Sequence, residues 1–142
     1  MAYATDSDLG ARLTQQKLID LTDFENTGSV DSDRAQAALD FASGLIDSYC
    51  GGRYSLPLNP SDQIVDACVS IAVYKLYEGR QRVIPETVKD SRTDAMKFLM
   101  DVSGGKASLA QATVPQVSES NTVTRNHCEQ PEVFDINKLK GF

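Results

Sequence analysis

The sequence contains no tryptophan, one histidine and only three cysteines among its 142 residues. Cys50, Cys68 and Cys128 are an odd number without a Cys-x-x-Cys pair, which argues against a disulfide framework and against a zinc site. We interpret them as reduced thiols of an intracellular protein. No apolar run approaches the ~18 residues of a membrane-spanning helix, and the first residues lack the basic and apolar regions of a secretory signal. We therefore expect no membrane partner.

Basic residues are also scarce. The chain has 14 Lys and Arg against 20 Asp and Glu, a net charge of −6. Residues 1–50 hold three basic and nine acidic residues, whereas residues 51–110 hold eight and seven. Proteins that grip DNA usually carry a basic patch, because neutralising phosphates drives their affinity. The composition predicts a protein to which DNA does not adhere.

Patterns that carry catalysis are missing as well. The sequence has no glycine-rich phosphate loop, metal motif or nucleophile elbow. His127 and Cys128 are adjacent in a polar stretch, whereas a Cys–His nucleophilic pair has to meet across space. The loop from Asp23 resembles a calcium loop in its first positions, but Arg34 occupies the twelfth, where calcium requires a bidentate glutamate. We predict no enzyme activity, no cofactor and no metal, and interpret this loop as a capped connector between helices.

The apolar spacing predicts an all-α bundle of four to five helices. Short helices are expected at 6–12 and 14–21. A long helix follows from Asp31 or Ser32, with Gly51–Gly52 ending it through left-handed backbone geometry. Two more are expected from about residue 61 to Gly79 and from Pro85 to Gly104–Gly105. The predicted buried stripe of the last helix is Val88, Ala95, Phe98, Leu99 and Val102.

After Leu109 the composition changes, which divides the chain into a helical domain (1–109) and a C-terminal extension (110–142). Residues 110–130 are mostly small and polar and cannot form a core alone. Residues 131–142, which we call the docking arm, regain apolar side chains. A polar tether that ends in an apolar peptide is typical of a docking segment, although a frayed terminus is the alternative. The candidate docking residues are Val133, Phe134, Ile136, Leu139 and Phe142.

Two charged groups are candidate interfaces. Asp33, Asp40 and Asp47 recur every seven residues and so form one stripe on the long helix. This stripe is either a solvated face or a surface that faces a like-charged polymer or a neighbouring subunit. The basic group is either a solvated connector or an acceptor for acidic residues of the next copy, in a head-to-tail association that closes into a ring. It consists of Arg80, Arg82, Lys89 and Arg92.

Several segments together resemble the phage Mu-like head–tail junction proteins of tailed phages. They are Tyr-Ala-Thr-Asp-Ser-Asp-Leu at 3–9, Leu-Ile-Asp-Leu-Thr-Asp at 18–23, the run at 31–49 from Asp-Ser-Asp-Arg to Ile-Asp-Ser-Tyr, and Gly-Arg-Tyr-Ser-Leu-Pro-Leu at 52–58. Gly-Lys-Ala-Ser-Leu at 105–109 and the closing Val-Phe-Asp-Ile-Asn-Lys-Leu-Lys-Gly-Phe continue the resemblance. The resemblance covers most of the chain except about 110–130.

The resemblance implies a small helical adaptor, also called a connector or head-completion protein, at the head–tail junction of the virion. Copies would form a ring, usually twelvefold, between the portal and a tail-side neck or terminator protein. Genomic DNA would pass through without specific binding, and no catalytic residue is implied. The acidic stripe is then a candidate channel lining, and the docking arm a candidate contact with the portal or a neighbouring subunit. The alternative is a monomeric cytoplasmic helical binding or regulatory module.

Overall fold

The computed structural model describes residues 2–110, and the regular structure in this range is helical. The helices are α1 (Asp6–Arg12), α2 (Gln15–Thr22), α3 (Ser32–Cys50), α4 (Asp62–Gly79) and α5 (Glu86–Ser103). The predicted all-α class is confirmed, and the five helices begin and end close to the predicted residues. The docking arm, with Val133, Phe134, Ile136, Leu139 and Phe142, lies outside the described residues, as do His127 and Cys128.

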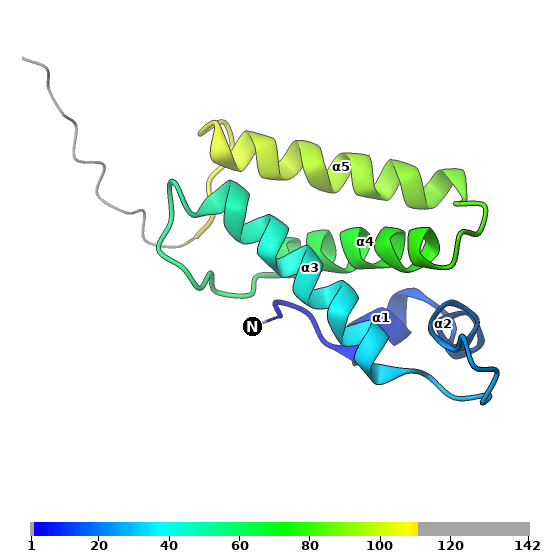
Figure 1. The fold of residues 1–142 in the computed structure, drawn as a ribbon. Helices are drawn as coiled ribbons and strands as arrows, with labels where there is room; N and C mark the ends of the chain where they lie inside the picture. Colours follow the sequence, from blue (N-terminus) through cyan, green and yellow to red (C-terminus); the bar gives the residue numbers. More distant parts are fainter. Residues whose placement is uncertain (1, 111–142) are drawn as a thin grey trace, which may run out of the picture.

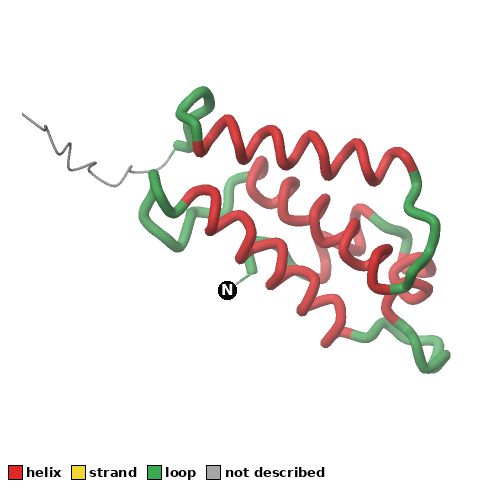
Figure 2. Tube along the Cα trace, turned by 45° about the horizontal axis from the view of Figure 1, so that its top comes forward, coloured by secondary structure: helices red, strands yellow, loops and turns green. Residues whose placement is uncertain are grey.

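Helix α4 is the centre of the bundle. Helices α3 and α5 pack along it, and the short α1 packs on its first half, where Arg12 binds Asp66 and Ser70. Helix α2 lies at the end where α3 begins and α4 ends (Figures 1 and 2). A helix that is apolar on nearly all sides is typical of a core position. The buried residues of α4 are accordingly spread around it: Ile64, Ala67, Cys68, Val69, Ser70, Ile71, Ala72, Val73, Leu76 and Tyr77.

Helix α5 lies at the edge of the bundle and buries a narrower stripe. Ala95, Leu99 and Val102 are buried, whereas Val88 and Phe98 are only half-buried. The predicted buried stripe is therefore confirmed at Ala95, Leu99 and Val102, whereas Val88 and Phe98 pack against the core with part of their surface exposed. The physical reason is that α5 contacts the bundle through α4 and α3 alone, so side chains at the margin of its apolar face keep contact with solvent.

The helix ends follow local hydrogen bonding. The Asp31 carboxylate accepts hydrogen bonds from the backbone N–H groups of Asp33 and Arg34, so Asp31 is the cap of α3, as one of the two predicted candidates. At the other end, Gly51 has φ −63°, and the expected left-handed geometry is wrong there. A Cβ at Gly51 would lie 2.8 Å from the Asp47 carbonyl oxygen, which explains the glycine by close approach instead. Gly105 does adopt the left-handed region, with φ +80°.

Tyr3 ties the N-terminal segment to the bundle. Its side chain is buried, its hydroxyl donates to the Asp47 carboxylate, and the same oxygen accepts from the Leu58 N–H at 3.0 Å. Its backbone N–H donates to Ser43 Oγ at 3.0 Å. Burial and the hydrogen bond to Asp47 raise the pKa of Tyr3 to about 12. One phenol thus joins the N-terminus, α3 and the connector before α4.

Candidate functional site

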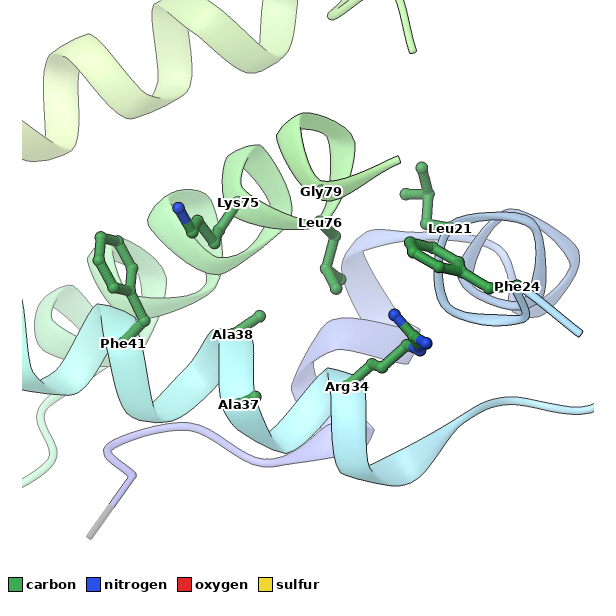
Figure 3. Close-up of a pocket in the computed structure, with 9 residues that line it drawn as sticks. All are labelled: Leu21, Phe24, Arg34, Ala37, Ala38, Phe41, Lys75, Leu76 and Gly79. Carbon is green, nitrogen blue, oxygen red and sulfur yellow. The ribbon is translucent and has the colours of Figure 1, made fainter. Parts of the chain in front are cut away.

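An apolar groove lies between α3, the end of α4 and the loop that follows α2 (Figure 3). Its volume is about 220 Å³. We call it the α3–α4 groove. Its lining residues are Leu21, Phe24, Arg34, Ala37, Ala38, Phe41, Lys75, Leu76 and Gly79.

Two phenyl rings stand at opposite ends of the α3–α4 groove (Figure 3). Phe24 is 39% exposed and Phe41 is 49% exposed, so both rings are in partial contact with solvent. The floor between them is buried and includes Leu21, Ala38 and Leu76. The groove therefore has a buried apolar base and two partly exposed aromatic side walls, against which an apolar side chain could pack.

Small residues create the hollow. Ala37 on α3 is exposed, and Gly79 closes α4 without a side chain. A Cβ built on Gly79 would meet nothing within 4 Å, so the space beside it is open. Larger residues at these positions would fill the groove from inside the subunit.

Cations surround both rings. The Arg34 guanidinium carbon lies 3.8 Å from the centroid of the Phe24 ring and that of Arg80 lies 4.8 Å from it, while Lys75 Nζ lies 4.7 Å from the Phe41 centroid. At exposed sites each such cation–π contact contributes about 0.5–1 kcal/mol. Contacts within the subunit therefore favour the observed positions of both rings.

Two carboxylates share these cations. Asp31 pairs with Arg34 and Glu78 pairs with Lys75, each at 2.8 Å. The hydrogen bond from Lys75 lowers the pKa of Glu78. Because all four side chains are more than a third exposed, these ion pairs are weak and exchange readily with other partners.

The loop after α2 is closed by Asp23 and Arg80. The Asp23 carboxylate accepts hydrogen bonds from the N–H groups of Thr27 (3.0 Å) and Gly28 (2.7 Å), which lower its pKa, and the Arg80 guanidinium donates to the Asp23 carbonyl oxygen. Both carboxylate oxygens of Asp23 are thus engaged within the turn. The interpretation of this segment as a capped connector is confirmed by these bonds and by the Asp31 cap.

The structure divides the acidic stripe. Asp33 and Asp40 are exposed, and Asp40 accepts a hydrogen bond from Gln36 Nε2 at 3.0 Å. Asp47 is half-buried and bound to Tyr3. The carboxylates of Asp33 and Asp40 therefore face solvent, whereas that of Asp47 has a structural role because it binds Tyr3. The role of the stripe as a channel lining or subunit interface stays a prediction.

The four basic candidates have separate surroundings. Arg80 packs on Phe24, and the Arg92 guanidinium carbon lies 4.4 Å from the centroid of the Tyr74 ring. Lys89 Nζ lies 3.5 Å from a Glu86 carboxylate oxygen, and Arg82 is exposed. Two of these side chains thus stabilise their own subunit. Their role in contacts between copies also stays a prediction.

Within residues 2–110, no three His, Cys, Asp or Glu side chains are grouped closely enough to hold a metal ion. Cys50 and Cys68 are free and buried, and burial raises the pKa of both thiols. None of the helices in this range combines the length and the hydropathy that crossing a bilayer requires.

Sequence reasoning missed the α3–α4 groove. The sequence does place two aromatic residues outside the predicted apolar faces. Phe24 lies in a polar loop, and Phe41 does not belong to the apolar residues that recur every three or four positions in α3. A single exposed ring is ordinary, whereas contiguous apolar patches mark contact surfaces, and only the folded chain brings these two rings to one groove.

The described residues thus define an all-α bundle protein whose surface carries a small apolar groove between two partly exposed aromatic rings. Residues 3–126 match the family described as bacteriophage Mu, Gp36, and the chain belongs to this family. It is 33% identical to the Mu-like prophage FluMu protein gp36 of Haemophilus influenzae, over 99% of this chain and 97% of the relative. It is 31% identical to Gene product J of Escherichia phage Mu, over 100% of this chain and 99% of the relative. The chain is therefore a phage protein of the Mu type.

Proposed function

We propose that this protein is the head–tail adaptor of a Mu-like phage. Copies form a ring beneath the portal, join the capsid to the tail-side neck, and let genomic DNA pass through the bore. The observation that carries this proposal is membership of the Mu Gp36 family across residues 3–126, together with the resemblance of these segments to head–tail junction proteins.

The charge distribution supports a conduit. Residues 1–50 carry a net charge of −6, and Asp33 and Asp40 project from α3 into solvent. A channel that bound phosphates tightly would stall the DNA, because each neutralised phosphate adds to the affinity. Carboxylates along the bore repel the DNA backbone and keep the cargo moving.

The docking arm supplies a contact with the portal or with a neighbouring subunit. Burial of Phe134, Leu139 and Phe142 would contribute roughly 5 kcal/mol per copy before ordering losses. When the same weak contact is repeated around a ring, the multivalent attachment is much stronger than any single contact.

The test is loss of the gene from a phage or prophage that encodes it. Electron microscopy of induced lysates should show heads without tails beside free tails, and the wild-type gene supplied in trans should restore joined particles. Normal tailed particles from the mutant would overturn the proposal.

A finer test uses the full chain with Phe134→Ser, Leu139→Ser and Phe142→Ser together. Asn137→Ser in the same segment is the matched control. The triple variant should fail to restore tailed particles and should no longer co-sediment with portal. The Asn137→Ser control should restore tailed particles and should co-sediment with portal. Full restoration by the triple variant would remove the docking arm from the mechanism.

A further inference from the structure

We propose that the α3–α4 groove receives the docking arm, residues 131–142, of a second copy of this chain. The inference rests on the proposed function in one respect, since a ring requires contacts between copies. It adds which two surfaces meet.

The size of the groove fits side chains. Small-molecule sites usually enclose ~300–1,000 Å³. The α3–α4 groove encloses about 220 Å³, with a buried floor and the half-exposed rings of Phe24 and Phe41 as walls. Such a hollow accommodates a few apolar side chains of a peptide, and burying the two rings removes apolar surface from water.

The composition of the arm matches this hollow. Residues 131–142 contain five large apolar residues in a stretch of twelve, after twenty residues (111–130) in which they are sparse. Among them, Phe134 and Phe142 supply rings that can pack against the two rings of the groove in offset or edge-to-face geometry.

The charges of the arm are divided between its two halves. Glu132 and Asp135 lie in its first half, after Glu129, and Lys138 and Lys140 lie in its second half, so only the first half is complementary to cations. The cations at the rim of the groove are Arg34 and Lys75, whose present partners are exposed carboxylates in weak pairs. Acidic residues of an incoming arm can take the place of those partners while the apolar side chains enter the groove.

The placement of the two surfaces allows a contact between copies, and the ring of the proposed function requires one. The described chain ends beside the connector after α3, where the Leu109 N–H donates to the Tyr54 hydroxyl at 3.0 Å. The groove lies at the opposite end of the bundle, where α3 begins and α4 ends (Figures 1 and 3). The α3 residues that line it, 34–41, lie about 14–24 Å along the helix from Cys50. The twenty residues 111–130 can extend to about 66 Å, so the second experiment below separates the groove of the same subunit from that of a neighbour. An arm that enters the groove of the next copy makes the head-to-tail contact from which closed rings are built.

The first experiment titrates the full chain into a fluorescein-labelled synthetic peptide of residues 129–142 and follows fluorescence anisotropy. Wild-type protein should bind the peptide saturably. Gly79→Leu places a side chain in the open space of the groove and should weaken binding at least tenfold. Gly10→Leu is the matched control, since a Cβ at Gly10 also meets nothing within 4 Å but lies on α1. Circular dichroism checks that both variants are folded.

The second experiment separates the arm of a neighbour from that of the same subunit. A photo-cross-linking amino acid replaces Phe134 in the ¹⁴N chain, which is mixed with ¹⁵N wild-type chain and irradiated. Mass spectrometry should find light arm peptides joined to heavy peptides that contain Phe24 or Phe41. Cross-links to the groove within the light chain alone would overturn the inference, because the arm would then fold back on its own subunit.

Absence of saturable peptide binding, or equal binding by the Gly79→Leu variant, would overturn the inference as well. These results leave the adaptor role itself open to the test of tail joining. Conversely, tailed particles that form without the gene would refute the adaptor role while the peptide experiment still decides whether groove and arm bind.

Discussion

Replacement of Tyr3 by phenylalanine is a direct test of how the N-terminal segment is held. The variant keeps the buried ring and removes one oxygen. That oxygen donates to Asp47 and accepts from the Leu58 N–H. Tyr3→Phe therefore leaves a buried backbone donor and a half-buried carboxylate without this partner.

The two losses have calculable sizes. An unsatisfied buried donor costs about 1–3 kcal/mol, and a lost hydrogen bond to a partly hydrated carboxylate adds about 1 kcal/mol. The expected destabilisation is about 2–4 kcal/mol. The raised pKa measures a different quantity, since burial is its largest cause. It sets the stability that the folded state loses when Tyr3 ionises, which is about 2.7 kcal/mol for a shift from 10.0 to about 12 at 1.36 kcal/mol for each pKa unit.

The same shift predicts a pH dependence. Because the folded state has the higher pKa, the stabilisation is fully present below pH 10 and is lost as the pH rises towards 12. Urea unfolding followed by circular dichroism at 222 nm should give a wild-type advantage of about 2–4 kcal/mol at pH 7. That difference should shrink between pH 10 and 12.

Tyr74→Phe is the matched control, since the ring of Tyr74 that faces Arg92 is retained. This variant should stay within about 0.5 kcal/mol of wild type. A Tyr3→Phe protein as stable as this control, or a wild-type advantage that does not change with pH, would refute the proposed network.

Three further predictions concern backbone conformation, the charge of Asp23 and the acidic stripe. Gly44 is exposed in the middle of α3, and a new Cβ there meets nothing within 4 Å, so Gly44→Ala should raise the free energy of unfolding by about 0.5–1 kcal/mol. Gly105 has φ +80°, so Gly105→Ala should lower the free energy of unfolding by about 1–2 kcal/mol. Equal effects of the two variants in urea unfolding would contradict the backbone conformations assigned to these glycines. Asp23→Asn should lower the urea midpoint at pH 7, and because the folded pKa of Asp23 is depressed, its difference from wild type should vanish as the pH falls through that pKa; a difference that persists in acid would point to a cause other than charge. Asp33→Lys with Asp40→Lys should convert a protein that leaves duplex DNA unshifted in a low-salt gel assay into one that binds it in a salt-sensitive way, and unchanged mobility would show that the stripe does not set the DNA response.

The helices were predictable from the sequence because local signals and apolar period agree. Asp31 precedes an apolar pattern in α3 that needs no tertiary information, and α4 is so apolar that only a central position suits it. The predicted bounds therefore lie close to those of the structure.

Other features depend on contacts between segments far apart in the chain. Tyr3 and Tyr54 are buried although each lies outside a helix, and neither has a periodic pattern around it. Gly51 was expected to supply a left-handed turn, yet its role is close approach to a carbonyl oxygen that only the folded chain places there. The α3–α4 groove likewise needs the end of α4 to meet the start of α3, which no local pattern encodes.

The burial of Cys50 and Cys68 has a consequence for the covalent durability of the protein. Oxidants attack the thiolate, and an enclosed thiol with a raised pKa is withheld from them both by access and by its proton. Sulfenic acid formation at these two positions requires the bundle to open first. A change from reducing to oxidising surroundings therefore leaves the thiols of Cys50 and Cys68 reduced while the bundle stays folded.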